Sequence, residues 1–230
     1  MSQWADLVIG TEREPDGDRA PLAAADQRRE QMLRAALDVI AERGYPDTRI
    51  ADVAERAGTS PALVIYYFKT KDQLLTEAIR YSEDGWYREG LRRIAALPTA
   101  ALRLEELVAM NCLPEEDPDP RGWALLWLDL WAQAARNPGL AATRQRTDER
   151  WRQAIESLVR EGQAAGEFGD VDPADFAATL SAMLDGFAIQ IALHDPVLVP
   201  ERAFELGMRF ASDLLGFDWK PGRRAQRAAS

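Results

Sequence analysis

The residue types that most often carry catalysis are scarce in this sequence. It has one histidine, His194, and one cysteine, Cys112, among 230 residues. Carboxylates such as Glu105 and Glu106 are adjacent in sequence, so they diverge around a helix, which is typical of solvated side chains. We find no His/Glu metal-ligand spacing on a helix, no nucleophile elbow and no Gly-rich phosphate loop. We therefore expect no enzymatic activity, no metal and no cofactor.

The tryptophans of this sequence could bind a ligand. Trp123, Trp127 and Trp131 are spaced four residues apart, so they lie along one face of a helix. One interpretation is an ordinary helix core, and the other is a cavity for an apolar or amphipathic small molecule, because such cavities are mostly apolar and aromatic. The opposite walls of that cavity could come from five further side chains: Trp86, Tyr87, Met183, Phe187 and Gln190.

Two carboxylates lie at otherwise apolar positions. Asp129 stands between Leu128 and Leu130, and Asp185 follows Leu184. A buried carboxylate is costly unless it is paired. Each is therefore either solvated or paired elsewhere, or else it lines the cavity and favours a cationic or hydroxylated ligand; the sequence leaves both open.

A helix-turn-helix pattern occupies residues 48–68. Thr48 can cap a short helix that has a small, apolar inner face. Gly58 suits a sharp turn, and Ser60 followed by Pro61 is a typical start of a second helix. This arrangement places a recognition helix in the major groove of DNA.

Helical spacing recurs along the chain from about residue 26. Leu33, Leu37 and Ile40 belong to a first amphipathic helix. Later helices are predicted over 70–98, 100–112, 120–136, 139–164, 173–193 and 199–215. We see no strand pattern and no internal repeat, and therefore expect an all-α protein. Its predicted parts are a flexible tail over 1–25, a three-helix DNA-binding domain over 26–72, a larger ligand-binding and dimerisation domain over 73–216, and a flexible basic tail over 217–230.

The charge distribution permits DNA binding without arguing for it. The formal net charge is −10, but residues 26–72 hold eight acidic and eight basic side chains. Phosphate attraction depends on local charge, so the acidity elsewhere does not exclude DNA. The sequence shows neither the start of a signal peptide nor an apolar run long enough to span a bilayer. We expect a cytoplasmic protein that does not bind membranes.

The stretch over residues 30–80 resembles the DNA-binding signature of the TetR/AcrR family of bacterial transcriptional regulators. The elements that carry the resemblance are Thr48, Val53-Ala54, Ala57-Gly58-Thr59-Ser60, Tyr66-Tyr67-Phe68 and Lys71. The resemblance implies phosphate contacts near helix N-termini and base contacts from the recognition helix. The residues that it assigns to DNA are Thr48, Arg49, Thr59, Ser60, Pro61, Ala62, Leu63, Ile65, Tyr66, Tyr67 and Lys71. The chain departs from the family pattern at Ala62, Ile65 and Tyr67, where Gly, Tyr and His are frequent.

The same resemblance implies a ligand-responsive regulator. We expect a homodimer that contacts its partner through the last two helices, binds double-stranded operator DNA and releases it when a small effector binds. The long helix from Thr70 joins both predicted domains and would act as the lever. Alternatives are an activator of the same fold and a helical adaptor that binds another protein.

Overall fold

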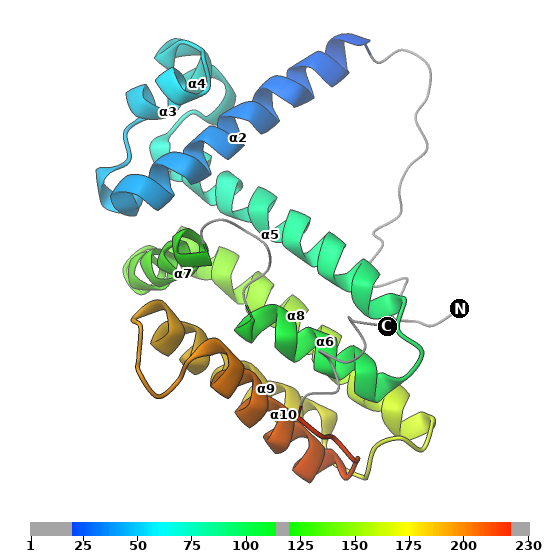
Figure 1. Ribbon diagram of the computed structural model, residues 1–230. Coiled ribbons are helices and arrows are strands. Elements are labelled where there is room, and N and C mark those ends of the chain that lie inside the picture. The colour runs from blue at the N-terminus through cyan, green and yellow to red at the C-terminus, as the bar shows by residue number, and fades with distance from the viewer. Residues whose placement is uncertain (1–19, 114–119, 222–230) are drawn as a thin grey trace. The chain divides into compact units, whose positions relative to one another are not determined.

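The computed structural model describes residues 20–113 and 120–221, and within them the side chains of residues 20–24, 83 and 120–126 are not described. Its regular elements are α-helices, and the described residues contain no strand, which confirms the all-α prediction (Figure 1). The helices are α2 (Ala20–Asp47), α3 (Ile50–Arg56), α4 (Pro61–Phe68), α5 (Lys71–Ala95), α6 (Ala100–Cys112), α7 (Pro120–Ala134), α8 (Pro138–Ala164), α9 (Pro173–Ala192) and α10 (Pro200–Leu215).

Helix α2 begins six residues before the predicted start at residue 26. The segment over 20–25 is rich in alanine, the strongest helix former, and its proline stands in the first turn, where proline is tolerated. Near its other end, α2 is interrupted at Gly44, whose φ of 79° and ψ of 160° are not helical. The chain therefore changes direction just before Tyr45.

The described residues fall into two compact units. The N-terminal unit contains residues 20–89 and 121–146, and the C-terminal unit contains residues 90–113 and 147–221. Helices α5 and α8 each contribute to both units. The functional boundary predicted between residues 72 and 73 stays a prediction, because compactness groups residues by contact and not by role.

The core of the N-terminal unit joins the three-helix segment to later parts of the chain. Met32, Leu33, Phe68, Leu74 and Ile79 are almost completely buried in it. The same core contains Leu130 and Ala134 of α7 and Leu140 of α8, with Trp127 packed against it. Helix α7 therefore belongs to the structure that holds the helix-turn-helix in shape.

The C-terminal unit is built mainly from α6, α9, α10 and the second half of α8. Gly207 lets α10 pack closely on α6, because a Cβ there would lie 3.0 Å from Val108 Cγ1. In the same unit, Arg103 of α6 forms an ion pair with Glu161 of α8 at 3.0 Å.

Residues just after α10 are packed in this unit. The Phe217 ring contacts Phe168, and Trp219 Nε1 donates to Glu105 Oε1 at 3.3 Å. Glu105 is buried, so its interpretation as a solvated carboxylate was wrong; the indole replaces part of its hydration. Burial also raises the pKa of the Cys112 thiol to about 12.

In the described part of the chain, no helix combines the length and the apolarity needed to cross a membrane.

Candidate functional site

The turn between α3 and α4 is set by local backbone chemistry. Gly58 has a φ of 62°, a left-handed value that suits glycine, and its N–H donates to the carbonyl of Glu55. Ser60 is the N-cap of α4, because its hydroxyl accepts a hydrogen bond from the N–H of Leu63 at 3.2 Å. Pro61 occupies the first turn of α4. The predicted helix-turn-helix is thus present.

Thr48 does not cap α3 as its position suggested. Arg49 is the N-cap residue and makes no side-chain capping bond. The Thr48 side chain is only 1% exposed, and its Oγ1 donates to the carbonyl oxygen of Gly44 at 2.8 Å. The interruption of α2 at Gly44 brings this carbonyl within reach, so the hydroxyl stabilises the turn between α2 and α3. The phosphate contact assigned to Thr48 stays a prediction.

Helix α4 has an inner and an outer face. Val64 and Phe68 are buried, and Leu63 and Tyr67 are half-buried against the same core. The outer face consists of residues spaced as one side of a helix: Pro61, Ala62, Ile65 and Tyr66. Ile65 is 48% exposed and Tyr66 is 69% exposed. A solvent-facing surface of this kind is typical of a contact surface.

The basic side chains around this face are mostly held by protein groups. Lys69 Nζ donates to the carbonyl of Tyr66 at 2.7 Å, and Lys71 Nζ donates to that of Pro46 at 2.8 Å. Arg56 Nη2 contacts both carboxylate oxygens of Glu42.

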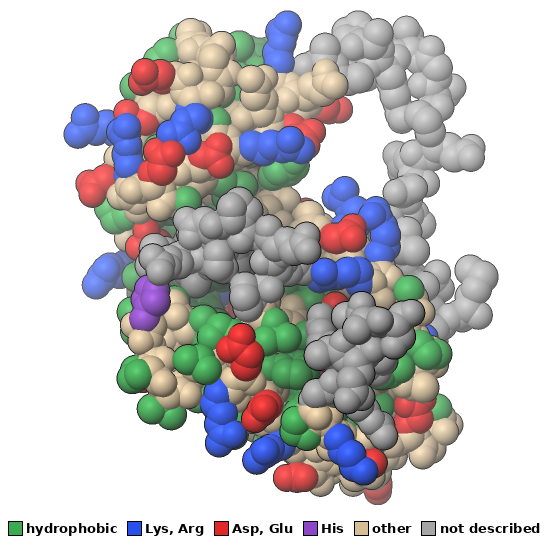
Figure 2. All heavy atoms as spheres, in the orientation of Figure 1, with side chains coloured by type: hydrophobic (Ala, Val, Ile, Leu, Met, Phe, Trp, Pro, Cys, Tyr) green, Lys and Arg blue, Asp and Glu red, His purple; other side chains and the backbone are tan. Residues whose placement is uncertain are grey.

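Arg49 differs from these cations. Its guanidinium is exposed, and within the described chain it makes no ion pair and no side-chain hydrogen bond. Figure 2 shows acidic and basic side chains interspersed on this part of the surface, in keeping with the local charge balance.

A carboxylate from α7 supports the junction at the end of α2. Asp129 Oδ2 accepts a hydrogen bond from the N–H of Tyr45 at 2.9 Å. Tyr45 is 5% exposed, and its hydroxyl lies 3.5 Å from Asp72 Oδ1. This placement answers the question that the sequence left open, since Asp129 is paired with a backbone N–H of the helix-turn-helix segment. Asp185 is half-buried and has an interaction partner.

The predicted ligand-binding residues divide between the two units. In the N-terminal unit, the rings of Trp127 and Trp131 have centroids 6.3 Å apart, and Trp86 packs edge-on against the buried Tyr87. The side chain of Trp123 lies outside the described residues. In the C-terminal unit, three residues of α9 are half-buried: Met183, Phe187 and Gln190. That these side chains line one cavity stays a prediction.

Trp131 already carries a cation. The Arg144 guanidinium lies 5.8 Å from the centroid of its ring. The Trp131 Nε1 is buried and has no hydrogen-bond partner among the described residues. One indole therefore offers both an electron-rich face and a donor.

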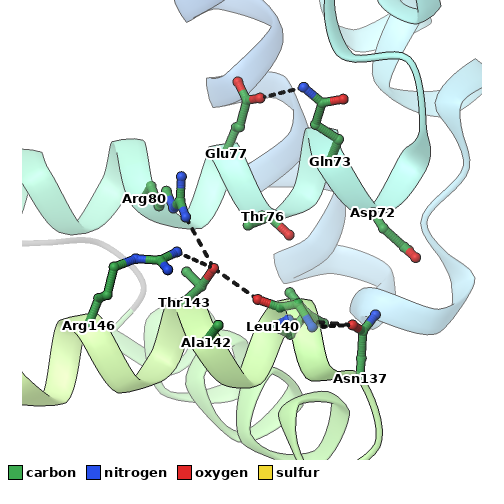
Figure 3. A pocket seen from close by; sticks show the side chains of 11 residues that line it. Asp72, Gln73, Thr76, Glu77, Arg80, Asn137, Leu140, Ala142, Thr143 and Arg146 are labelled. Atoms are coloured by element: carbon green, nitrogen blue, oxygen red, sulfur yellow. Dashed lines mark hydrogen bonds between the residues drawn. The ribbon is translucent and has the colours of Figure 1, made fainter.

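A polar groove of about 420 Å³ lies between the start of α5 and the start of α8, and sequence reasoning did not anticipate it (Figure 3). Arg80 and Arg146 both donate to Thr143 Oγ1, at 3.4 and 3.0 Å. Asn137 caps α8 by accepting from the N–H of Gly139. The predicted ligand-binding aromatics do not line this groove. Among the described residues, no three His, Cys, Asp or Glu side chains cluster as a metal site requires.

Comparisons with known proteins agree with this geometry. The family model for bacterial regulatory proteins of the tetR family matches residues 32–78, and the C-terminal model of BetI-type transcriptional repressors matches residues 100–216. The HTH-type transcriptional regulator BetI from Burkholderia mallei is 30% identical over 199 residues, which cover 84% of this chain and 96% of the relative. The chain belongs to the TetR family of bacterial transcriptional regulators.

Other TetR-type proteins extend the comparison. BetI from Escherichia coli is 30% identical over 193 residues, covering 83% of this chain and 95% of the relative. A protein described as a transcriptional regulator from Saccharomonospora viridis, solved in complex with choline, is 29% identical with a TM-score of 0.73; the match covers 81% of this chain and 96% of that one. A Rhodococcus structure described as a TetR-family regulator is 27% identical with a TM-score of 0.73, covering 83% and 99%. This TetR-family chain is a ligand-responsive transcriptional regulator with a helix-turn-helix for DNA.

Proposed function

We propose that this regulator is a homodimeric repressor that leaves its operator when a small quaternary ammonium compound of the choline class binds. The observation that carries the choice of effector is the indole pair of α7, considered beside the 29% identical protein that was solved with choline. Indole faces attract quaternary ammonium groups through the ring quadrupole, which is how many proteins recognise choline-like ligands.

The surroundings of Trp131 suit such a ligand in two respects. The Arg144 guanidinium over its ring marks this face as one that attracts a cation. The buried Nε1 can donate to a hydroxyl oxygen, a group that choline carries beside its ammonium. Trp127, tilted 49° to Trp131, would supply a second wall. Trp86 and Tyr87, which belong to the same unit, are the candidates for the rest of the site.

Helix α7 also offers a route from the effector to the DNA. It carries the indoles on one side, places Leu130 in the core of the helix-turn-helix and holds the Tyr45 N–H through Asp129. A ligand that moves α7 would therefore change the support of the segment that leads into α3. The ligand need only favour the altered arrangement by a few kcal/mol to release DNA.

Dimerisation through α9 and α10 would give the protein two recognition helices, one for each half-site of the operator. Three large apolar residues of α10, Phe204, Met208 and Leu215, are buried within their own unit. Leu193, Val197 and Leu214 remain strongly exposed in the same unit and would contribute apolar contact area to such a dimer. We further propose that the protein acts as a repressor in the cytoplasm.

Calorimetric titration of the full chain tests the effector. Choline should bind, whereas 3,3-dimethyl-1-butanol, its neutral carbon isostere, should bind at least tenfold more weakly because it has no charge for the indole faces. Replacing Trp131 by Leu should weaken choline binding strongly and leave the weak binding of the neutral isostere nearly unchanged. Equal affinity for the two compounds would contradict the cation-recognising site.

A further inference from the structure

The outer face of the recognition helix lacks the groups that read most bases. Pro61, Ala62 and Ile65 have no side-chain donor or acceptor, and no residue of α4 carries a charge. Tyr66 has the one hydroxyl on this face, and its ring is covered on one side by Lys69 Nζ at 5.1 Å and on another by the edge-on ring of Tyr67. The bidentate pairing of Arg with guanine, or of Asn or Gln with adenine, is therefore unavailable along α4.

Four basic side chains near α4 are held by protein groups and, where they are observed, do not supply hydrogen bonds to bases. Lys69 is bound to the carbonyl of Tyr66 in α4, and Lys71 is bound to the carbonyl of Pro46 in α2 and also lies over the Tyr45 ring. Arg43 is paired with Asp52, and Arg56 with Glu42. These groups suit contacts with phosphates, which position a protein on DNA but do not specify sequence.

Only one base presents an apolar group in the major groove, and that group is the C5-methyl of thymine. Ile65 is an aliphatic side chain held outward, with Ala62 one turn earlier on the same face. Contact with a methyl group would remove apolar surface of both partners from water, which stabilises the complex.

We propose that Ile65, with Ala62 beside it, reads thymine C5-methyl groups, so that thymines and not guanines specify the operator under α4. This inference rests on operator binding and adds the chemistry of the bases that are read. It also makes Ile65 a specificity-determining residue, whereas Tyr66, Lys69 and Lys71 would contact the phosphate backbone of the DNA.

The test begins with selection of duplexes from a random-sequence library by the full-length protein. Each thymine of the selected duplex is then replaced by deoxyuridine, which removes only the methyl group. At the thymines facing α4 we expect about fourfold weaker binding for each methyl removed, the value of one buried methylene-sized group. A duplex in which a 5-methylcytosine·G pair replaces the T·A pair should bind the protein more tightly than a duplex with an unmethylated C·G pair at the same place.

Protein variants then assign the effect to a side chain. Ile65→Ala should weaken binding to the thymine duplex by a similar factor and should no longer distinguish thymine from deoxyuridine, while Ile65→Val should keep part of the distinction. Arg49→Ala is the matched control, because it should weaken binding to both duplexes equally. Ile65 is half exposed, so these variants should fold, which thermal melting checks.

Two results would overturn the inference while leaving operator binding intact. One is a selected operator in which deoxyuridine has no effect at any position or guanines under α4 dominate. The other is a thymine preference that persists unchanged in Ile65→Ala. A library in which no sequence is enriched would instead contradict operator binding itself, and the inference with it.

Discussion

The outer face of α4 and the side chains of α7 both present large apolar groups, and they differ in what surrounds them. Ile65 and Tyr66 of α4 are exposed to solvent. On α7, Leu130 is buried in the core, and Trp131 packs against Trp127 and under Arg144. The exposed side chains of α4 are therefore available for contact as they stand, whereas a ligand that displaced Trp127 or Leu130 of α7 would disturb the core that also holds α4.

The largest expected effect is a difference in stability between a variant of α7 and a variant of α4. Leu130→Ala should lower the free energy of unfolding by about 2–5 kcal/mol, because it leaves a cavity in the core shared with α2 and α5. Ile65→Ala should cost less than about 1 kcal/mol, because half of the side chain is already in water. Denaturant unfolding of both variants measures the difference. Similar losses would show that α7 is not part of the supporting core.

The second effect concerns the hydrogen bond between α7 and the end of α2. Asp129→Ala leaves the buried Tyr45 N–H without its acceptor, which should cost about 1–3 kcal/mol of stability. If α7 also transmits the effector signal, choline should change operator affinity much less in this variant than in the parent protein. Fluorescence anisotropy with and without choline measures that ratio. Asp129→Asn keeps an acceptor oxygen and should restore most of the ratio; a ratio unchanged by Asp129→Ala would exclude this route.

The third effect concerns the cations near α4. Arg49 makes no ion pair or side-chain hydrogen bond with the described residues, whereas most of its basic neighbours are held. Arg49→Ala should therefore make the negative slope of log affinity against log salt concentration shallower by about one. It should weaken binding to every DNA sequence by an equal factor. Operator binding over a range of salt concentrations measures the slope. A sequence-dependent loss would mean that Arg49 reads bases.

The smallest effect is a loss of stability in alkali. Burial, followed by the nearby Asp72 carboxylate, raises the pKa of Tyr45 to about 12 from its ordinary value of 10. The folded state therefore holds this proton more tightly than the unfolded state, so the contribution is present below pH 10 and is lost as the pH rises to 12. It should be of the order of 1 kcal/mol. Tyr45→Phe should flatten the unfolding free energy between pH 10 and 12; an unchanged slope would assign the loss to other groups.

Local sequence signals predicted the parts of this protein that local chemistry determines. Gly58, Ser60 and Pro61 specify a turn and a helix start within a few residues, and the structure has both. The helix predicted over 173–193 likewise begins at Pro173 in the structure, where the Asp172 carboxylate caps two backbone N–H groups. Such interactions need no information from the rest of the chain.

Features that depend on long-range packing could not be predicted in the same way. Asp129 stands in an apolar run, and only the fold shows that its acceptor function serves Tyr45, 84 residues earlier. Thr48 has the sequence position of a helix cap, but the break at Gly44 draws its hydroxyl to another carbonyl. Glu105 resembled a solvated carboxylate until Trp219, far along the chain, was found to donate to it. The partners of Asp129 and Glu105 are distant in sequence, and the Thr48 hydrogen bond depends on the interruption of α2, so the sequence pattern around these residues does not identify their partners.

We propose above that this regulator binds a specific DNA sequence and releases it when a choline-class cation binds. Fluorescence anisotropy of a selected duplex, titrated with the full-length protein in the presence and absence of choline, tests it most directly. We expect choline to weaken binding by a factor of about 5–150, the usual range of coupling between two sites, and 3,3-dimethyl-1-butanol to have little effect. Unchanged affinity at choline concentrations that saturate the protein would contradict it.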